Sequence, residues 1–253
     1  YVDWGGTGRP IVLLHGLQDT ARNWDHIASH LTSLGRVYAL DARGHGDSEH
    51  VPGHYQFSEF VLDVKAFLEE LDAEDAVLIG HSAGGKYAFS HAAHNPSRLA
   101  GLIIVDMDPD AVNKGSSVMF ERYRSEGDEW DTLESVIERL RLREPKTSDQ
   151  LLEHIAFIMT KRTDNQKLIW KRDRQVISEY ERPDAWDTLS MIKVPTLIIR
   201  GAESTLLRRE IAERMEATIR GSQLVEIHHG GHWCIDENPE SFLREIKKFL
   251  EES

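Results

Sequence analysis

Short apolar runs alternate with amphipathic stretches along most of the chain. Strand-like apolar runs occupy 11–14, 37–40, 76–79, 102–105, 196–199 and 223–227. Between and after them, the sequence has helical periodicity over 21–34, 58–71, 83–94, 208–217 and 239–250. Apolar strands separated by helices are typical of a parallel sheet, because parallel strands need crossover connections. We therefore expect an α/β fold with a mostly parallel central sheet flanked by helices.

This alternation stops in the middle of the chain. Residues 110–190 have helical periodicity, many charged side chains and no run that reads as a strand. The strand pattern resumes soon after 190, and 253 residues suit one large domain with an insertion. The sequence predicts a core made of 1–109 and 191–253, with a helical cap inserted at 110–190.

The most informative motif follows the strand at 76–79. Gly80-His81-Ser82-Ala83-Gly84 leads from this strand into a helix and has the form G-x-S-x-G. In such a turn the serine takes a strained backbone conformation that exposes its hydroxyl. Side chains at Gly80 and Gly84 would collide with the neighbouring strand and helix. This context predicts that Ser82 is a nucleophile.

A serine hydroxyl needs a base, and neutral histidine is the usual base near neutral pH. The loop after the last strand carries His232, and His228, His229 and Cys234 lie close to it in sequence. The spacing of these four residues matches no strong zinc pattern. We expect His232 to act as the base, and we expect neither a metal nor a cofactor.

Five segments together resemble the α/β-hydrolase family over essentially the whole chain. They are Gly16 after a buried strand, the loop 41–48, the G-x-S-x-G turn, Val194-Pro195-Thr196 before a late strand, and Gly231-His232. The resemblance implies an α/β-hydrolase fold whose cap follows the strand after the nucleophile. It also implies that the amides of Leu17 and Ala83 form the oxyanion hole, and that Ser82 and His232 act as nucleophile and base.

The acidic member of the predicted catalytic set is harder to assign. In most of the family it lies three residues beyond the glycine of the late strand, where this chain has Ser204. Glu203 comes one residue early, whereas Asp106 ends the strand that follows the nucleophile. Haloalkane dehalogenases place the acid at that strand end, and so does a branch with a serine nucleophile that includes 2-(acetamidomethylene)succinate hydrolase. That hydrolase also resembles this chain in having a serine after the late strand. We therefore favour Asp106 and keep Glu203 and Asp108 as alternatives.

Charge and composition exclude several other classes of function. The net charge of −13 argues against nucleic acid as a partner, because phosphate binding needs a basic surface. No apolar run approaches the roughly 18 residues that a membrane span needs. A single cysteine allows no internal disulfide, which fits a reducing compartment, so we expect a cytoplasmic location.

The cap contains many cationic side chains, which most simply form a solvated helix surface. A sharper hypothesis is that Arg122 or Arg143 faces the cleft and binds a carboxylate, because arginine does so well in bidentate geometry. The choice of these two rests partly on the resemblance to the succinate-derivative hydrolase.

Together these patterns predict a serine hydrolase that cleaves carboxylic esters through an acyl-enzyme. Hydrolysis of an amide, a lactone or a carbon–carbon bond in a carboxylate-bearing small molecule is the alternative. A ligand receptor without catalysis remains a hypothesis of another class, because a fold does not fix a function.

Overall fold

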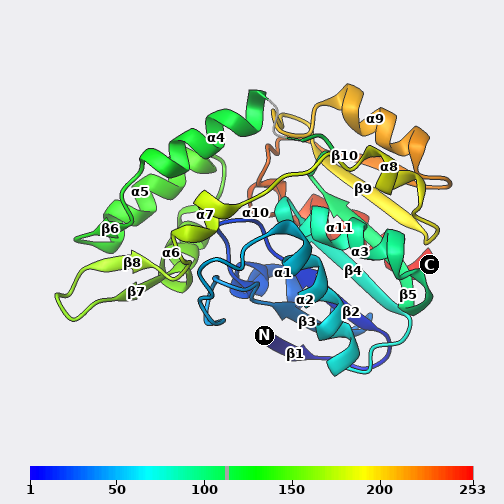
Figure 1. Cartoon of the computed structure of the whole chain (residues 1–253), viewed down its shortest axis with the longest axis horizontal. Coiled ribbons are helices and arrows are strands. Elements are labelled where there is room, and N and C mark those ends of the chain that lie inside the picture. Colours follow the sequence, from blue (N-terminus) through cyan, green and yellow to red (C-terminus); the bar gives the residue numbers. More distant parts are fainter. Residues whose placement is uncertain (112–113, 253) are drawn as a thin grey trace.

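The computed structural model describes residues 1–111 and 114–252, and its main sheet has seven strands in the order β1-β3-β2-β4-β5-β9-β10 (Figure 1). The strands are β1 (Val2–Gly5), β2 (Pro10–Leu14), β3 (Arg36–Leu40), β4 (Ala76–His81), β5 (Leu99–Val105), β9 (Thr196–Gly201) and β10 (Gln223–Ile227). β1 pairs with β3 in an antiparallel direction, and the other neighbours are parallel. The expected mostly parallel sheet is confirmed, although the short edge strand β1 was not predicted.

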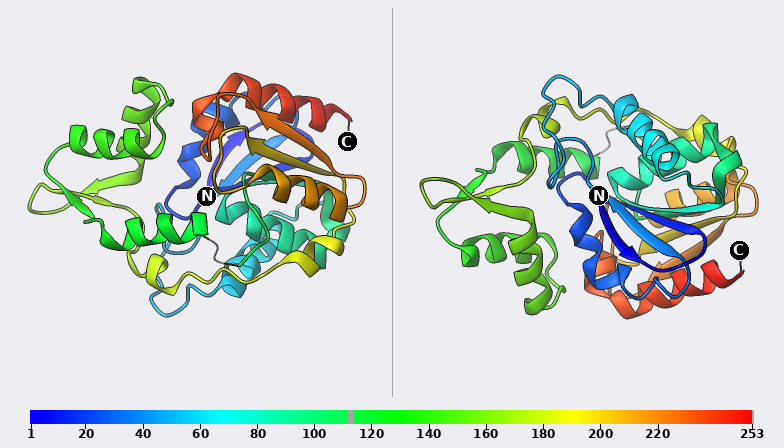
Figure 2. Two further views of the ribbon diagram at one scale, coloured as in Figure 1. Left: turned by 90° about the horizontal axis from the view of Figure 1, so that it is seen from above. Right: turned by 90° about the horizontal axis from the view of Figure 1, so that it is seen from below.

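Helices cover both faces of this sheet (Figure 2). One face packs against α1 (Asp25–Ala28) and α11 (Pro239–Glu252), and the other packs against α2 (Phe57–Glu70), α3 (Ala83–His94), α8 (Trp186–Ser190) and α9 (Arg209–Thr218). Successive side chains of a strand point to opposite faces, so Ile11 joins the first layer and Val12 the second. Short helices η1 (Ala21–Trp24), η2 (Pro96–Arg98) and α10 (Cys234–Glu237) complete the core.

The insertion forms a separate layer beside the core, at the left of Figure 1. Its helices are α4 (Lys114–Ser125), α5 (Leu133–Arg143), α6 (Asp149–Met159) and α7 (Gln175–Glu179). It also contains an antiparallel sheet of β6 (Glu129–Trp130), β8 (Leu168–Trp170) and β7 (Thr160–Arg162), in that order. The expectation of an insertion without strands was therefore wrong. Strands of two or three residues are too short to produce a readable alternation.

The C-terminal part of the predicted cap range belongs structurally with the core. Helix α8 packs against α3, and Leu189 is fully buried in the apolar layer on that side of the sheet. A smaller apolar cluster of the cap itself joins α5, α6 and β8 through residues such as Leu140, Ile155 and Trp170. The cap thus has its own small core, and the chain re-enters the main layer before residue 190.

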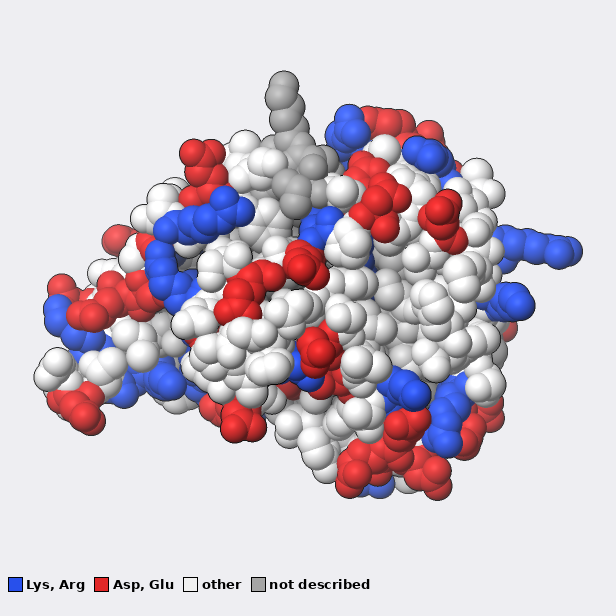
Figure 3. Space-filling model, in the orientation of Figure 1, with Lys and Arg blue, Asp and Glu red and all other residues white. Residues whose placement is uncertain are grey.

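Acidic and basic side chains are interspersed over the face seen in Figure 3, on the cap as well as on the core. Within 1–111 and 114–252, every helix is too short or too polar to cross a lipid bilayer.

Candidate active site

The candidate site lies at the carboxyl edge of the sheet. Strand β4 pairs with β2 on one side and β5 on the other, with Gly80 opposite Leu14 and Ile104. Ser82 and Asp106 follow β4 and β5 directly, and both have positive φ, 52° and 45°. Positive φ is strained for residues other than glycine and is often found at functional sites. The register of these strands therefore brings the two side chains to one place.

Two glycines allow the sharp turn at Ser82. A Cβ atom added at Gly80 would lie 2.3 Å from the carbonyl oxygen of Gly84. A Cβ atom added at Gly84 would lie 2.4 Å from the carbonyl oxygen of Leu14. The close approach of helix and strand that was predicted from the motif is confirmed.

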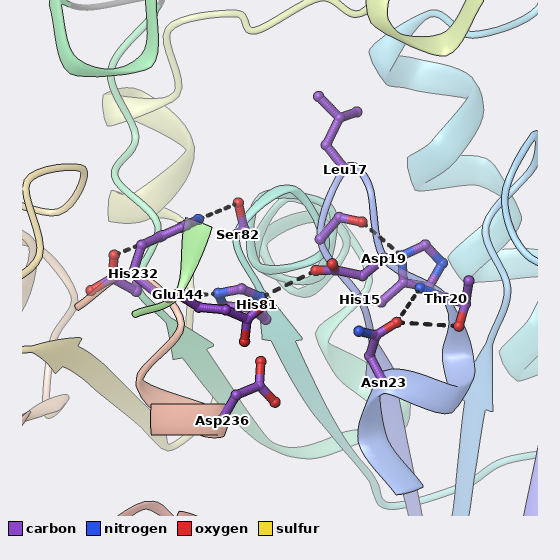
Figure 4. A network of polar contacts seen from close by, with 12 residues as sticks. His15, Leu17, Asp19, Thr20, Asn23, His81, Ser82, Glu144, His232 and Asp236 are labelled. Carbon is purple, nitrogen blue, oxygen red and sulfur yellow. Dashed lines mark hydrogen bonds and ion pairs between the residues drawn. The ribbon is translucent and has the colours of Figure 1, made fainter. Parts of the chain in front are cut away.

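The side chains of Ser82, His232 and Asp106 form a continuous hydrogen-bonded chain. His232 Nε2 lies 3.0 Å from Ser82 Oγ, and His232 Nδ1 lies 2.8 Å from Asp106 Oδ1. Figure 4 shows the imidazole of His232 directed at the hydroxyl of Ser82. With Nδ1 donating to the carboxylate, Nε2 is free to accept the proton of the hydroxyl. This arrangement can activate the serine.

Asp106 is completely buried and held in place by neighbouring groups. Its Oδ2 accepts a hydrogen bond from the amide of Gly201 at 2.8 Å, and its Oδ1 accepts one from Ser204 Oγ at 2.6 Å. Ser204 in turn accepts from the amides of Leu206 and Leu207. The serine at the usual acid position thus orients the carboxylate that comes from β5. The sequence places Ser204 at the usual acid position but does not reveal this role.

The two alternative acids have other partners. Glu203 is about half exposed and forms an ion pair with Lys146, whose hydrogen bond lowers the pKa of the carboxyl. Asp108 is buried and lies 2.5 Å from Arg182. Of the three candidates, Asp106 is the one that the structure brings to His232.

The turn that carries Leu17 lies against Ser82. A Cβ atom at Gly16 would be 3.3 Å from Ser82 Cβ. His45 Nε2 lies 2.6 Å from the Leu17 carbonyl oxygen, and burial, together with the charge of His15, lowers the pKa of His45 to about 4. Ala83 is the first residue of α3, so its amide belongs to the first helical turn, which has no acceptors within the helix. Both predicted oxyanion residues are thus beside Ser82.

His81 supports the loop of His232. Burial, followed by the charge of His232, lowers the pKa of His81 to about 4, so its imidazole is neutral. His81 Nε2 lies 2.8 Å from the backbone carbonyl oxygen of His232. This role of His81 could not be predicted from the sequence, because nothing local indicates a partner 151 residues away.

A small cavity lies beside Ser82 among the described residues. The cavity has a volume of about 10 Å³, enough for about one water molecule. It is lined by Gly16, Leu17, Gln18, Asp19, His81, Ser82, Met119, Tyr123, Arg143, His232 and Trp233. Arg143 is therefore at the cavity wall. Arg122 lies outside this set, is partly exposed and pairs with Glu126.

The described part of the chain contains no group of three or more histidine, cysteine, aspartate or glutamate side chains that could hold a metal ion. Cys234 is a free, buried thiol.

Comparison with known proteins agrees with this architecture. Residues 11–245 match the model of the alpha/beta hydrolase family. The sn-1-specific diacylglycerol lipase ABHD11 of Xenopus tropicalis is 30% identical over 98% of this chain and 80% of its own length. Esterase Rv0045c of Mycobacterium tuberculosis is 24% identical over 98% of this chain and 85% of its own.

Among solved structures, E-2-(acetamidomethylene)succinate hydrolase superimposes with a TM-score of 0.92 at 20% identity, covering 98% of this chain and 93% of that one. At this identity the likeness concerns the fold. The family match spans nearly the whole chain, and its relatives include a lipase and an esterase. The chain therefore belongs to the α/β-hydrolase family.

Proposed function

We propose that this protein is a serine hydrolase that cleaves carboxylic esters, with Ser82 as nucleophile, His232 as base and Asp106 as the acid. The observation that carries the proposal is the pair of contacts made by His232, 3.0 Å to Ser82 Oγ and 2.8 Å to Asp106 Oδ1. Esterase and lipase relatives support the same class of reaction. The substrate is a small molecule.

The reaction follows from this geometry. Ser82 Oγ attacks the ester carbonyl carbon while His232 Nε2 takes the hydroxyl proton. The carbonyl oxygen becomes an oxyanion, which the amides of Leu17 and Ala83 stabilise, and each such donor is worth about 10²–10³ in rate. The carbon–oxygen bond to the alcohol then breaks, and His232 gives its proton to the leaving oxygen.

Deacylation repeats these steps with water. His232 takes a proton from water, the hydroxide adds to the acyl carbon, and Ser82 Oγ leaves with the proton returned by His232. The carboxylic acid is released and the enzyme is restored. Asp106 keeps Nδ1 of His232 protonated and stabilises the imidazolium in both halves.

Access to Ser82 requires movement of the cap. The cavity of about 10 Å³ is far smaller than any ester, and Met119, Tyr123 and Arg143 of the cap form part of its wall. We expect these helices to move away before substrate enters and to return before the reaction, which excludes bulk water.

A chromogenic ester tests the proposal. The parent chain should hydrolyse 4-nitrophenyl butyrate, and Ser82→Ala should lose about 10⁴-fold or more in kcat. Ser190→Ala is the matched control, because that hydroxyl is at the surface and donates to the carbonyl of Asp187. A folded parent that binds small acids but turns over no ester, amide or lactone would instead favour a receptor.

A further inference from the structure

Arg143, the last residue of α5, is buried at the boundary between cap and core. Its side chain is only 2% exposed. Nη1 donates to Asp19 Oδ1 at 3.1 Å, while Nε and Nη2 donate to Glu144 Oε1 at 3.0 and 2.5 Å. The guanidinium carbon also lies 5.0 Å from the ring centre of Trp233. With two carboxylates and an aromatic ring, this cation already has a full set of partners.

Asp19 connects Arg143 to the turn that carries Leu17. The amide of Asp19 donates to the carbonyl of Gly16 at 3.1 Å and so closes that turn. Its Oδ2 lies only 2.7 Å from the position of a Cβ atom at Gly16, and 3.8 Å from Nδ1 of His81 (Figure 4). The Asp19 carboxylate therefore packs against Gly16 of the oxyanion turn and faces the residue before Ser82.

Trp233 connects Arg143 to the base. It follows His232 in the chain, and the two rings meet edge to face at 4.8 Å. A guanidinium over an indole is attracted by the negative face of the ring. One cap side chain therefore contacts the oxyanion turn through Asp19 and the loop of His232 through Trp233.

The charges around Arg143 make its contacts strong. Burial alone would raise the pKa of Asp19, but the charge of Arg143, together with those of the nearby histidines, holds this pKa below its usual range. Burial raises the pKa of Asp236, and the neighbouring Glu144 and Asp19 raise it further. Asp236, which also faces His26 at 3.3 Å, therefore holds a proton more readily than an exposed carboxyl, whereas Asp19 favours the ionised form opposite Arg143. Removing one partner of such a buried pair leaves an uncompensated charge.

We propose that Arg143 is a positioning residue, which couples closure of the cap to the alignment of the oxyanion turn and of the His232 loop. The inference rests on the proposed function. Opening the cap must separate Arg143 from Asp19 and Trp233 or draw their loops away. The catalytic groups are thus fully aligned only when the site is closed and water is excluded. This role differs from the direct carboxylate clamp that the sequence suggested for Arg143.

Two esters of matched length separate these roles, 4-nitrophenyl butyrate and mono-4-nitrophenyl succinate, which differ by a terminal carboxylate. A positioning role predicts that Arg143→Lys and Asp19→Asn each lower kcat about tenfold to a hundredfold on both esters, with little change in KM. The kcat of the double variant should be no lower than that of the more impaired single variant, because both substitutions break the same contact. Arg141→Lys is the control, since that side chain pairs with Asp149 at the surface.

The outcomes are distinct. A rise in KM for the succinate ester alone would make Arg143 a substrate clamp and overturn the inference. Parent-like kcat for Arg143→Lys and Asp19→Asn would overturn it too, and if the arginine variant does not fold, the near-isosteric Asp19→Asn decides alone. A parent that cleaves neither ester and whose Ser82 resists a fluorophosphonate overturns the proposed function itself.

Discussion

Core and cap achieve stability in different ways. In the core, strands β2, β4 and β5 are almost wholly buried between two helical layers. The cap buries a smaller apolar cluster and leaves Val118, Leu142 and Phe157 between 67% and 75% exposed. Its contact with the core at the site depends on the buried charges of Arg143 and Asp19.

This difference in packing separates the catalytic groups from the part of the molecule that covers them. The three side chains of the proposed triad come from β4, β5 and the loop after β10, so a rigid sheet fixes their distances. The part that we propose moves to admit substrate is the part with fewer apolar contacts. In this proposal the rigid core holds the catalytic side chains, and the more loosely packed cap controls access to them.

The largest effect should follow from Asp106→Asn in the core. Loss of the carboxylate leaves His232 in the wrong tautomer, so kcat should fall by about 10⁴. Glu203→Gln should change kcat less than about threefold, because this exposed side chain pairs with Lys146. Steady-state hydrolysis of a 4-nitrophenyl ester measures both, and a reversed order of the two losses would assign the acid to Glu203.

Hydrogen exchange compares the two layers directly. Amides of α5 and α6 should exchange about a hundredfold faster than those of β4 and β5, because local opening of the cap breaks fewer apolar contacts than opening the sheet. Mass spectrometry of peptides after timed labelling measures the ratio. Equal protection would mean that cap and core open as one unit.

A smaller loss is expected for Ser204→Ala. Ser204 Oγ donates a hydrogen bond to Asp106 Oδ1 at a distance of 2.6 Å. A hydrogen bond to a buried charge is worth about 1.5–3 kcal/mol. The amide of Gly201 still holds Oδ2, so kcat should fall roughly tenfold rather than 10⁴-fold. An unchanged kcat would show that the backbone contact alone orients the acid.

Lys86 should affect not turnover but the free energy of unfolding, as a pH dependence of stability. It is fully buried in α3, and its Nζ donates to the carbonyls of Pro109 and Asp110, where the chain leaves the core for the cap. Burial, assisted by the charge of Arg182, lowers the pKa of Lys86 to about 7. The unfolded value is near 10.4, so the charged form destabilises the fold.

That penalty is fully present below about pH 7 and is relieved as the pH rises toward the unfolded pKa. The parent should therefore gain stability relative to Lys86→Met between pH 7 and 10, by at most about 1.4 kcal/mol per pH unit. Urea unfolding at several pH values measures this gain, with exposed Lys193→Met as control. A difference that stays constant with pH contradicts the lowered pKa.

Much of the core could be predicted from sequence, because burial imposes a period that can be read along the chain. Six of the seven strands of the main sheet coincide with the predicted apolar runs, and Ser82 and His232 lie in recognisable motifs. Asp106 was favoured because it ends the strand that follows the nucleophile, where some branches of the family place the acid. The edge strand β1 and the three short strands of the cap leave too little pattern to read.

Interactions between distant segments were harder to predict. Arg143 and Asp19 are 124 residues apart, and a cationic helix surface looks the same in sequence whether or not one arginine is buried. Ser204 could be recognised as standing at the usual acid position, yet its bond to Asp106 depends on how β5 and β9 pair. Such contacts are decided by tertiary packing rather than by local pattern.

Covalent labelling measures directly whether Ser82 is the nucleophile. The parent chain is treated with a fluorophosphonate, digested and mapped by mass spectrometry. We expect one adduct, on Ser82, which disappears in Ser82→Ala and forms far more slowly in Asp106→Asn. An adduct on another serine, or labelling that persists in Ser82→Ala, would contradict this expectation.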